Sequence, residues 1–161
     1  MSSVENITVV SGDSTEFEMT VGAAKQSELL KRMLDDDNCV VDRVPLSNVN
    51  TTTLVKVMEY CQKHADHEAA MAGARVPIAD VEELKAWDAE FMKVDTDMLY
   101  HILTAADYME ILGLFDLACQ TVADLIKGKN PKKIRRIFNI KNDLTPQEEQ
   151  RFRAKYRWDF Y

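Results

Sequence analysis

The chain has 161 residues, enough for one domain with a buried core plus a short extension. Its 46% hydrophobic and 29% charged residues are typical of a soluble globular protein, and no apolar run approaches the length of about 20 residues that a membrane span needs. The first residues do not show the basic-then-apolar pattern of a signal peptide, so we expect none, and Cys39, Cys61 and Cys119 show no paired spacing. We therefore expect free thiols and a location in the cytoplasm and nucleus.

The charge is distributed unevenly. Residues 1–128 contain 10 Lys/Arg and 23 Asp/Glu, a net charge of −13, whereas residues 129–161 contain 10 and 4, a net charge of +6. An acidic body opposes binding along nucleic acid, which requires phosphate neutralisation over a large surface. The basic tail is better suited to a local protein interface.

The first half of the chain predicts strands followed by helices. Alternating residues at 7–10 and 17–21, separated by a turn at Ser11–Ser14, indicate a hairpin. We expect a helix over Ala23–Leu34, ended by the acidic run that follows it. A short strand is expected at Val44–Leu46, and its proline places it at a sheet edge or a strand start.

Helices dominate from Asn50 onward. Asn50 can cap a helix whose apolar residues have helical spacing. After this helix the sequence contains Ala, Gly and mixed charges without a regular apolar pattern. We expect a mobile surface loop over 64–78. A helix restarts at Asp80 and runs to Phe91, and Asp95 caps the next one.

The helix that follows Tyr108, expected to end at Ile126 before Gly128, is apolar on two sides. One side carries Ile111, Phe115, Ala118, Val122 and Ile126, and the other carries Leu114, Leu117, Thr121 and Leu125. A helix that is apolar on two sides must be covered on both. One side can face the core, and the other needs the tail or a partner.

The tail predicts two short helices. Asn130 precedes Pro131 at the first helical position, and Thr145–Glu148 is a capping box that also contains a proline. Glu149 adds acidic charge to the first turn, and several arginines and a lysine follow toward the other end, where the macrodipole favours cations.

No residue pattern indicates catalysis or metal binding. Cys61, His64 and His67 have a C-x2-H-x2-H spacing, but on a helix these side chains diverge and a fourth ligand is missing. A core cysteine followed by two solvated histidines is expected instead. Cys61 and Cys119 lie on apolar helix faces, which favours buried neutral thiols over activated thiolates. We expect no enzyme activity, cofactor, metal, small-molecule substrate, nucleic acid or membrane partner.

Phe138, Ile140 and Trp158 are the apolar residues of the tail that few neighbours can bury. Two interpretations are open: they pack on the domain's own helices, or they form an apolar patch for a partner with Trp158 as an anchor. The two are compatible, because part of the tail can pack while the rest remains exposed. Trp87 and Tyr108 are ambiguous on physical grounds alone.

Several long segments in order closely resemble the Skp1 family over nearly the whole chain. They are Val44–Val49, Glu59–Cys61 with His64, Trp87–Asp95, Ile126–Pro131 and Phe138–Glu149 with Trp158. The resemblance implies an α+β fold: a BTB/POZ-like domain over 1–128, with a small three-stranded sheet packed with helices, and a two-helix C-terminal extension over 129–161. It also implies an adaptor that bridges a cullin-1-type scaffold to F-box proteins in SCF ubiquitin ligases.

The resemblance also assigns binding residues. The cullin surface would comprise Asp107 and Tyr108. The F-box surface, formed by the extension together with roughly 100–128, would comprise Phe115, Cys119, Val122, Phe138, Ile140, Asn142, Asp143 and Trp158.

This chain departs from the family pattern at several positions. Asp107 replaces the usual Asn and cannot donate a hydrogen bond when ionised, and Leu144 replaces a Phe. Lys132 and Lys133 replace acidic residues, and the end of the chain is more basic than usual. We interpret the chain as a divergent paralogue with a narrowed or shifted F-box repertoire.

Three alternatives remain. An elongin-C-like adaptor would bind SOCS-box proteins, but it lacks the long tail. An F-box-protein-binding subunit of a non-cullin complex is favoured by Asp107. An enzyme would be revealed by thiol trapping.

Overall fold

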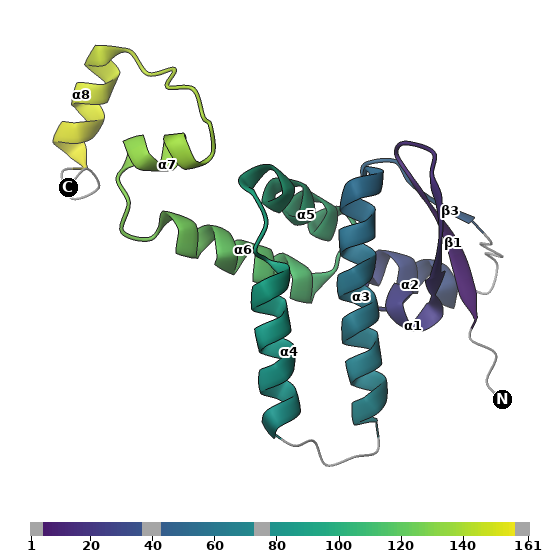
Figure 1. Cartoon of the computed structure of the whole chain (residues 1–161). Helices are drawn as coiled ribbons and strands as arrows, with labels where there is room; N and C mark the ends of the chain where they lie inside the picture. The colour runs from purple at the N-terminus through teal and green to yellow at the C-terminus, as the bar shows by residue number, and fades with distance from the viewer. Residues whose placement is uncertain (1–4, 37–42, 73–77, 157–161) are drawn as a thin grey trace. The chain divides into compact units, whose positions relative to one another are not determined.

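A computed structural model of the chain describes residues 5–36, 43–72 and 78–156. The chain divides into two compact units, residues 1–119 and 120–161, and each is considered by itself below. The mixture of strands and helices confirms the predicted α+β fold (Figure 1). The predicted domain boundary at 128/129 stays a prediction. Among the described helices, none combines the length and apolar content that a membrane span requires.

In the described residues, three strands form one sheet with the order β2-β1-β3. β1 (Asn6–Ser11) pairs antiparallel with β2 (Glu16–Thr20) and parallel with β3 (Arg43–Leu46). The hairpin prediction is confirmed, and so is the edge position of the strand that contains Pro45. Gly12 allows the turn to approach the chain after β3, since an added Cβ would lie 2.5 Å from the Ser47 carbonyl oxygen.

The single helix predicted over 23–34 is wrong, because two helices occupy this segment. α1 (Val21–Ala24) ends before Ser27, and α2 (Glu28–Asp35) starts after it. Ser27 has an extended backbone, and its hydroxyl oxygen accepts from the Leu30 amide at 3.2 Å. This N-cap starts a second helix where hydrophobic periodicity alone suggests continuity.

The surface loop predicted over 64–78 is wrong for residues 64–71. α3 (Thr51–Met71) begins at the predicted N-cap Asn50 but continues through this segment, and residues 73–77 lie outside the described residues. The side chains of Gln62 and Asp66 lie one helical turn apart and form a hydrogen bond of 2.8 Å that supports the helix. The alanines in this part of the helix are strong helix formers. Figure 1 shows α3 beside α4 (Ile78–Phe91).

Aromatic contacts join α3 to α4. His64 stacks on Tyr60 with ring centroids 4.0 Å apart, and its Nε2 lies 2.8 Å from Oδ1 of Asp88. Between the two helices, the Tyr60 ring lies 5.9 Å from the Phe91 ring, and the His64 ring lies 6.4 Å from the Trp87 ring (centroid distances). These contacts order the part of α3 whose sequence pattern is weakest.

α5 (Thr96–Tyr108) and α6 (Leu112–Ile126) begin and end near their predicted limits. Asp95 caps α5 as predicted by accepting from the Met98 amide at 2.7 Å. Gly128 has φ of 70°, the left-handed conformation expected after a helix end. Gly113 lets α6 approach α3, since a Cβ there would lie 2.7 Å from the Tyr60 hydroxyl.

The core of the first unit combines side chains from the sheet and the helices. α1 packs against α3, and α3 packs against α5. The largest fully buried side chains are Leu30, Leu46, Leu54, Leu99, Ile102, Met109, Ile111, Leu114, Val9, Val44, Val49 and Val57.

The described part of the second unit contains the end of α6 and two short helices, α7 (Pro131–Ile137) and α8 (Pro146–Lys155). Both predicted starts are confirmed. Asn130 accepts from the Lys133 amide at 2.9 Å, and Thr145 forms a reciprocal capping box with Glu148.

Candidate functional site

The first candidate surface lies where α5 ends. Asp107 and Tyr108 are both exposed, whereas the next residue, Met109, is fully buried. The helix is closed by two hydrogen bonds: the Ile111 amide donates to the Ala106 carbonyl at 2.9 Å, and the Glu110 amide donates to the Asp107 carbonyl at 3.2 Å. This is a Schellman cap, and Glu110 occupies its left-handed position with φ of 53°.

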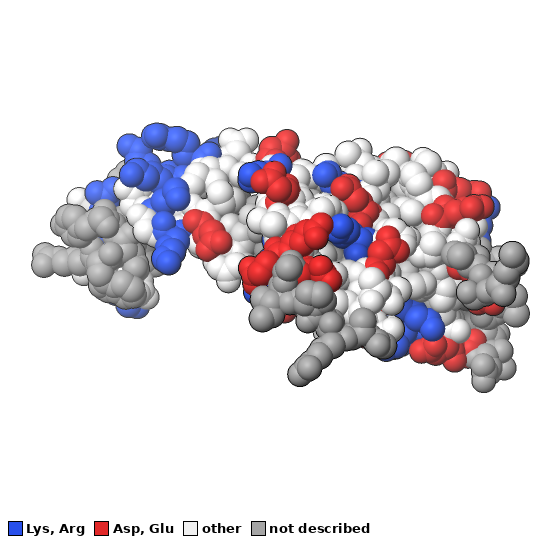
Figure 2. All heavy atoms as spheres, turned by 60° about the horizontal axis from the view of Figure 1, so that its bottom comes forward, with Lys and Arg blue, Asp and Glu red and all other residues white. Residues whose placement is uncertain are grey.

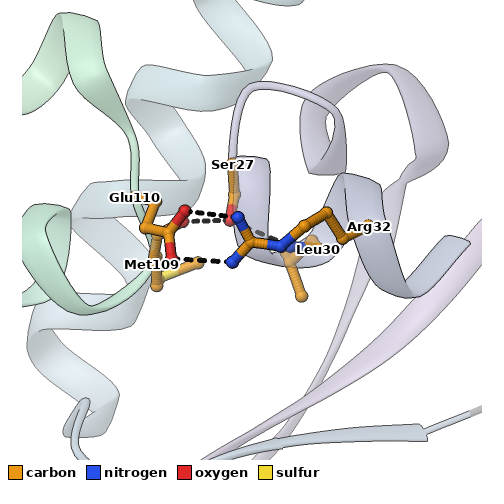
Figure 3. Close-up of polar contacts among 5 residues, drawn as sticks. All are labelled: Ser27, Leu30, Arg32, Met109 and Glu110. Carbon is orange, nitrogen blue, oxygen red and sulfur yellow. Dashed lines mark hydrogen bonds and ion pairs between the residues drawn. The ribbon is translucent and has the colours of Figure 1, made fainter.

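The N-terminus of α2 is hydrogen-bonded to this cap, as Figure 3 shows. The Ser27 hydroxyl donates to the Met109 carbonyl, and the Glu28 amide donates to the Glu110 carbonyl at 3.1 Å. A helix N-terminus has amides without a partner in the helix, and a helix C-terminus has carbonyls without one. The start of α2 therefore donates to carbonyls at the end of α5. The chain just after Tyr108 is therefore fixed from a distant part of the sequence.

An ion pair supports the same cap from outside. Arg32 of α2 donates two hydrogen bonds, of 2.8 and 2.7 Å, to the two carboxylate oxygens of Glu110 (Figure 3). The Arg32 guanidinium lowers the pKa of Glu110, chiefly through this hydrogen bonding. The helix end next to the exposed Tyr108 is thus hydrogen-bonded to α2 and carries an ion pair to it.

The second candidate surface includes one face of α6. Phe115, Cys119 and Val122 follow i, i+4, i+7 spacing and therefore share a helix face. Phe115 and Val122 are half-buried, and Cys119 is exposed. The expected buried thiol at Cys119 is wrong, because Ala118 takes the fully buried position next to it.

The segment after α7 carries the remaining described F-box candidates. Phe138 is half-buried, whereas Ile140, Asn142 and Asp143 are exposed. Asn139 has φ of 51°, and the Ile140 amide donates to the Arg135 carbonyl at 2.8 Å, so α7 also ends in a Schellman-type cap. Asn142 Oδ1 accepts from the Leu144 amide at 3.1 Å, which turns the chain toward α8.

The predicted F-box residues are thus distributed over the two units. Phe115 and Cys119 belong to the first unit, and Val122 and the residues after α7 belong to the second. Trp158 lies outside the described residues, so its anchor role stays a prediction. In the segment after α7, Phe138 is half-buried and Ile140 is exposed, and both interpretations of these apolar residues stay predictions.

The candidate metal residues have other roles. Cys61 is fully buried, and burial raises the pKa of its thiol to about 12. The prediction of solvated histidines is wrong for His64, whose ring is held between Tyr60 and Asp88, and His67 Nε2 is buried without a hydrogen-bond partner. Across residues 5–36, 43–72 and 78–156, no group of three His, Cys, Asp or Glu side chains is arranged to hold a metal ion.

Sequence reasoning missed the residues that shape these surfaces. Serine is a common N-cap residue, so Ser27 gives a local signal for a helix start, although it lies within an apolar pattern. Asn139 is a residue type that tolerates the left-handed conformation, but Glu110 gives no such signal. The large exposures of Tyr100 and Leu112 were not predicted either.

Comparison with known proteins identifies the family. Residues 112–159 match the Skp1 family dimerisation domain, and residues 5–66 match the Skp1 family tetramerisation domain. The chain is 46% identical over 159 residues to SKP1-like protein 1A of Arabidopsis thaliana, which covers 98% of this chain and 99% of that protein. The chain belongs to the Skp1 family. It is also 48% identical over 165 residues to SKP1-like protein 1 of Oryza sativa subsp. japonica, covering 96% of this chain and 94% of that one.

Membership of the Skp1 family supports an adaptor role in SCF ubiquitin ligases rather than an enzymatic one. It also supports the POZ-like assignment of the first unit, because the three strands, α1, α2 and most of α3 lie within the matched residues 5–66. An adaptor needs surfaces and no reactive centre. The two candidate surfaces are therefore the relevant features of this chain.

Proposed function

We propose that this chain is the adaptor subunit of an SCF-type cullin-RING ubiquitin ligase, bridging a cullin-1-type scaffold to F-box substrate receptors. One observation carries the proposal: large apolar side chains stay exposed at the two places that the family resemblance assigns to partners. Tyr108 is 36% exposed and Ile140 is 54% exposed. Exposed apolar groups at defined positions are typical of protein interfaces.

The cullin would bind at the corner formed by Asp107 and Tyr108. The Ser27 and Arg32 contacts hold this corner in the free chain, so little conformational entropy is lost when a partner binds. Tyr108 supplies apolar area with a polar hydroxyl, a combination that is common in interface anchors.

The F-box would bind through the face of α6 and the segment after α7. Phe115 and Val122 supply apolar area on α6, and Phe138 and Ile140 supply it after α7. Asn142 and Asp143 add exposed polar groups for the rim. The proposed location is the cytoplasm and nucleus, since the free Cys61 and Cys119 fit a reducing compartment.

Binding to the N-terminal region of a cullin, with and without a bound F-box domain, tests the proposal. Tyr108→Ala should weaken cullin binding at least about tenfold, as expected for an interface anchor, and leave F-box binding unchanged. Tyr100→Ala is the matched control, since Tyr100 is a 63% exposed tyrosine of the same helix. Equal losses in the two variants, or no ternary complex with the unmodified chain, would contradict the proposal.

A second candidate function is an F-box-protein-binding subunit of a complex without a cullin. Asp107 favours it, because an ionised carboxylate cannot replace the hydrogen bonds that an amide donates. F-box binding without cullin binding would support this alternative. Recovery of cullin binding in Asp107→Asn would then identify the residue responsible.

A further inference from the structure

The α7 helix carries positive charge that the helix itself does not require. Lys132, Lys133, Arg135 and Arg136 give four basic residues in a helix of seven. Its first turn contains no acidic residue, so Lys132 and Lys133 lie where the macrodipole disfavours cations. Arg135 and Arg136 lie in the last turn, where the macrodipole favours cations, so Lys132 and Lys133 are the two cations whose position does not favour the helix.

Part of this charge lines a hollow within the second unit. The hollow has a volume of about 90 Å³ and is lined by Asn130, Pro131, Lys132 and Arg135 near α7 and by Glu149 and Arg153 of α8. Two helices thus bring three cations and one carboxylate to the same small space.

The nearby carboxylates are already engaged. Glu149 pairs with Arg153 at 3.0 Å, and Glu148 accepts from the Thr145 amide at 2.9 Å in the capping box. Within the described part of the chain, no ion pair joins Lys132 or Arg135 to a carboxylate. These two side chains can therefore receive an anionic group from another molecule.

The imbalance extends over the whole described tail. Residues 129–156 contain nine Lys/Arg and three Asp/Glu. In Figure 2 the blue side chains crowd over this C-terminal part, at the left of the view. Charge complementarity therefore favours an acidic ligand.

A backbone hydrogen bond links a residue that lines the hollow to the proposed F-box surface. The carbonyl of Arg135 accepts from the Ile140 amide at 2.8 Å, so the residue that lines the hollow also holds the exposed Ile140 in place. A partner that covers Ile140 therefore lies close to the hollow.

We propose that this hollow binds an acidic segment of the F-box partner, adjoining its F-box, through Lys132 and Arg135. The inference rests on the proposed function and specifies the class of partner: F-box proteins with carboxylates next to the F-box. Arginine guanidinium groups suit such a ligand, because their paired donors match the two oxygens of a carboxylate.

A protein ligand fits better than a nucleic acid. The hollow is small, and residues 1–128 carry a net charge of −13 from 10 Lys/Arg and 23 Asp/Glu, which repels a long phosphate backbone. A short acidic segment can reach the hollow while the apolar contacts of the F-box supply most of the affinity.

The test measures binding of the full chain to one F-box domain in two versions. In the first version the segment next to the F-box is acidic, and in the second version Gln and Asn replace its Glu and Asp residues. The acidic version should bind about five- to tenfold more tightly at low ionic strength, and the difference should shrink as salt is added. Lys132→Glu with Arg135→Glu should abolish this preference but retain binding of the neutral version. Lys132→Glu places an acid in the first turn of α7, where it favours the helix.

The matched control is Arg151→Glu with Lys155→Glu, which changes the net charge equally on α8 outside the hollow. This control should keep most of the preference for the acidic version. Equal losses in the two double variants would show a general charge effect and overturn the inference, and so would equal binding of both F-box versions. Failure of both versions to bind would instead refute the proposed function. Displacement of the acidic version by a short RNA or by phosphatidylserine vesicles, dependent on Lys132 and Arg135, would overturn the inference in favour of a phosphate ligand.

Discussion

Arg32 and Glu110 form a two-pronged ion pair, with hydrogen bonds of 2.8 and 2.7 Å, across the helix end that presents Tyr108. They are far apart in the sequence, and Glu110 has φ of 53°, a conformation that side chains with a Cβ rarely adopt. The ion pair thus holds a strained residue in a proposed binding corner. Strained residues are often found at functional sites, where the surrounding structure maintains them.

Substitutions of Glu110 separate the strain from the ion pair. Glu110→Gly and Glu110→Ala both remove the pair, but only glycine adopts the left-handed conformation freely. The glycine variant should therefore be about 1 kcal/mol more stable than the alanine variant. Urea unfolding followed by circular dichroism measures the difference. Equal stability of the two variants would contradict the role of the left-handed residue.

The charge of Glu110 should make this corner sensitive to acid. Arg32 lowers the pKa of Glu110 from its ordinary value of 4.5. Because the folded state holds the carboxyl ionised, the stabilisation is present above that value and is lost as the pH falls through the lower folded pKa. Titration of the Glu110 carboxyl by NMR should show the lowered pKa, and Arg32→Ala should raise it. The neighbouring Lys31→Ala is the control and should leave the pKa unchanged.

Ser27 also holds the helix end next to Tyr108, through a buried contact. Its buried hydroxyl accepts from the Leu30 amide and donates to the Met109 carbonyl. Ser27→Ala removes both bonds and should lower the free energy of unfolding by about 1–3 kcal/mol. Ser47→Ala, an exposed serine after β3, is the matched control and should change stability by less than about 0.5 kcal/mol. Similar effects of the two substitutions would show that Ser27 is not a special contact.

Helix starts could be predicted from the sequence because their signals are local. Asn50, Asp95, Asn130 and Thr145 each accept a hydrogen bond from the amide three residues ahead, so residue type and position suffice. Gly128 is similar, since its left-handed conformation follows from the lack of a Cβ. The family resemblance then gave the fold beyond these local elements.

Long-range contacts could not be predicted in this way. The Ser27 hydroxyl is bonded to the Met109 carbonyl, and His64 in the extended part of α3 contacts Asp88 of α4. Cys119 has apolar neighbours in sequence, but its exposure depends on which side of α6 the core occupies. The candidate residues were named from the resemblance, whereas the corner that holds Tyr108 became visible only in the structure.

The two described cysteines should react very differently with alkylating reagents. Cys119 is exposed, whereas Cys61 is buried and its pKa is raised to about 12. The raised pKa keeps the Cys61 thiol protonated at pH 8, and the thiolate is the reactive form. Iodoacetamide followed by peptide mass spectrometry should therefore label Cys119 in the folded chain and Cys61 only in urea.

Labelling also reports on the proposed F-box surface. A bound F-box domain should slow the alkylation of Cys119 at least about tenfold, because an interface core excludes solvent. Unchanged labelling of Cys119 in a saturated complex would remove this residue from the interface. Rapid labelling of Cys61 in the folded chain would contradict its burial.

Ile140 should contribute affinity for the F-box without contributing stability to the free chain. Its side chain is 54% exposed, and its position is fixed by the Asn139 turn and the bond from its amide to the Arg135 carbonyl. Ile140→Ala should weaken F-box binding about tenfold, or about 1–2 kcal/mol, and change the free energy of unfolding by less than about 0.5 kcal/mol. Val55→Ala is the matched control, because Val55 is 48% exposed on α3 outside the proposed surface. Calorimetric titration with one F-box domain measures both variants, and equal affinities for the Ile140 and Val55 variants would exclude Ile140 from the interface.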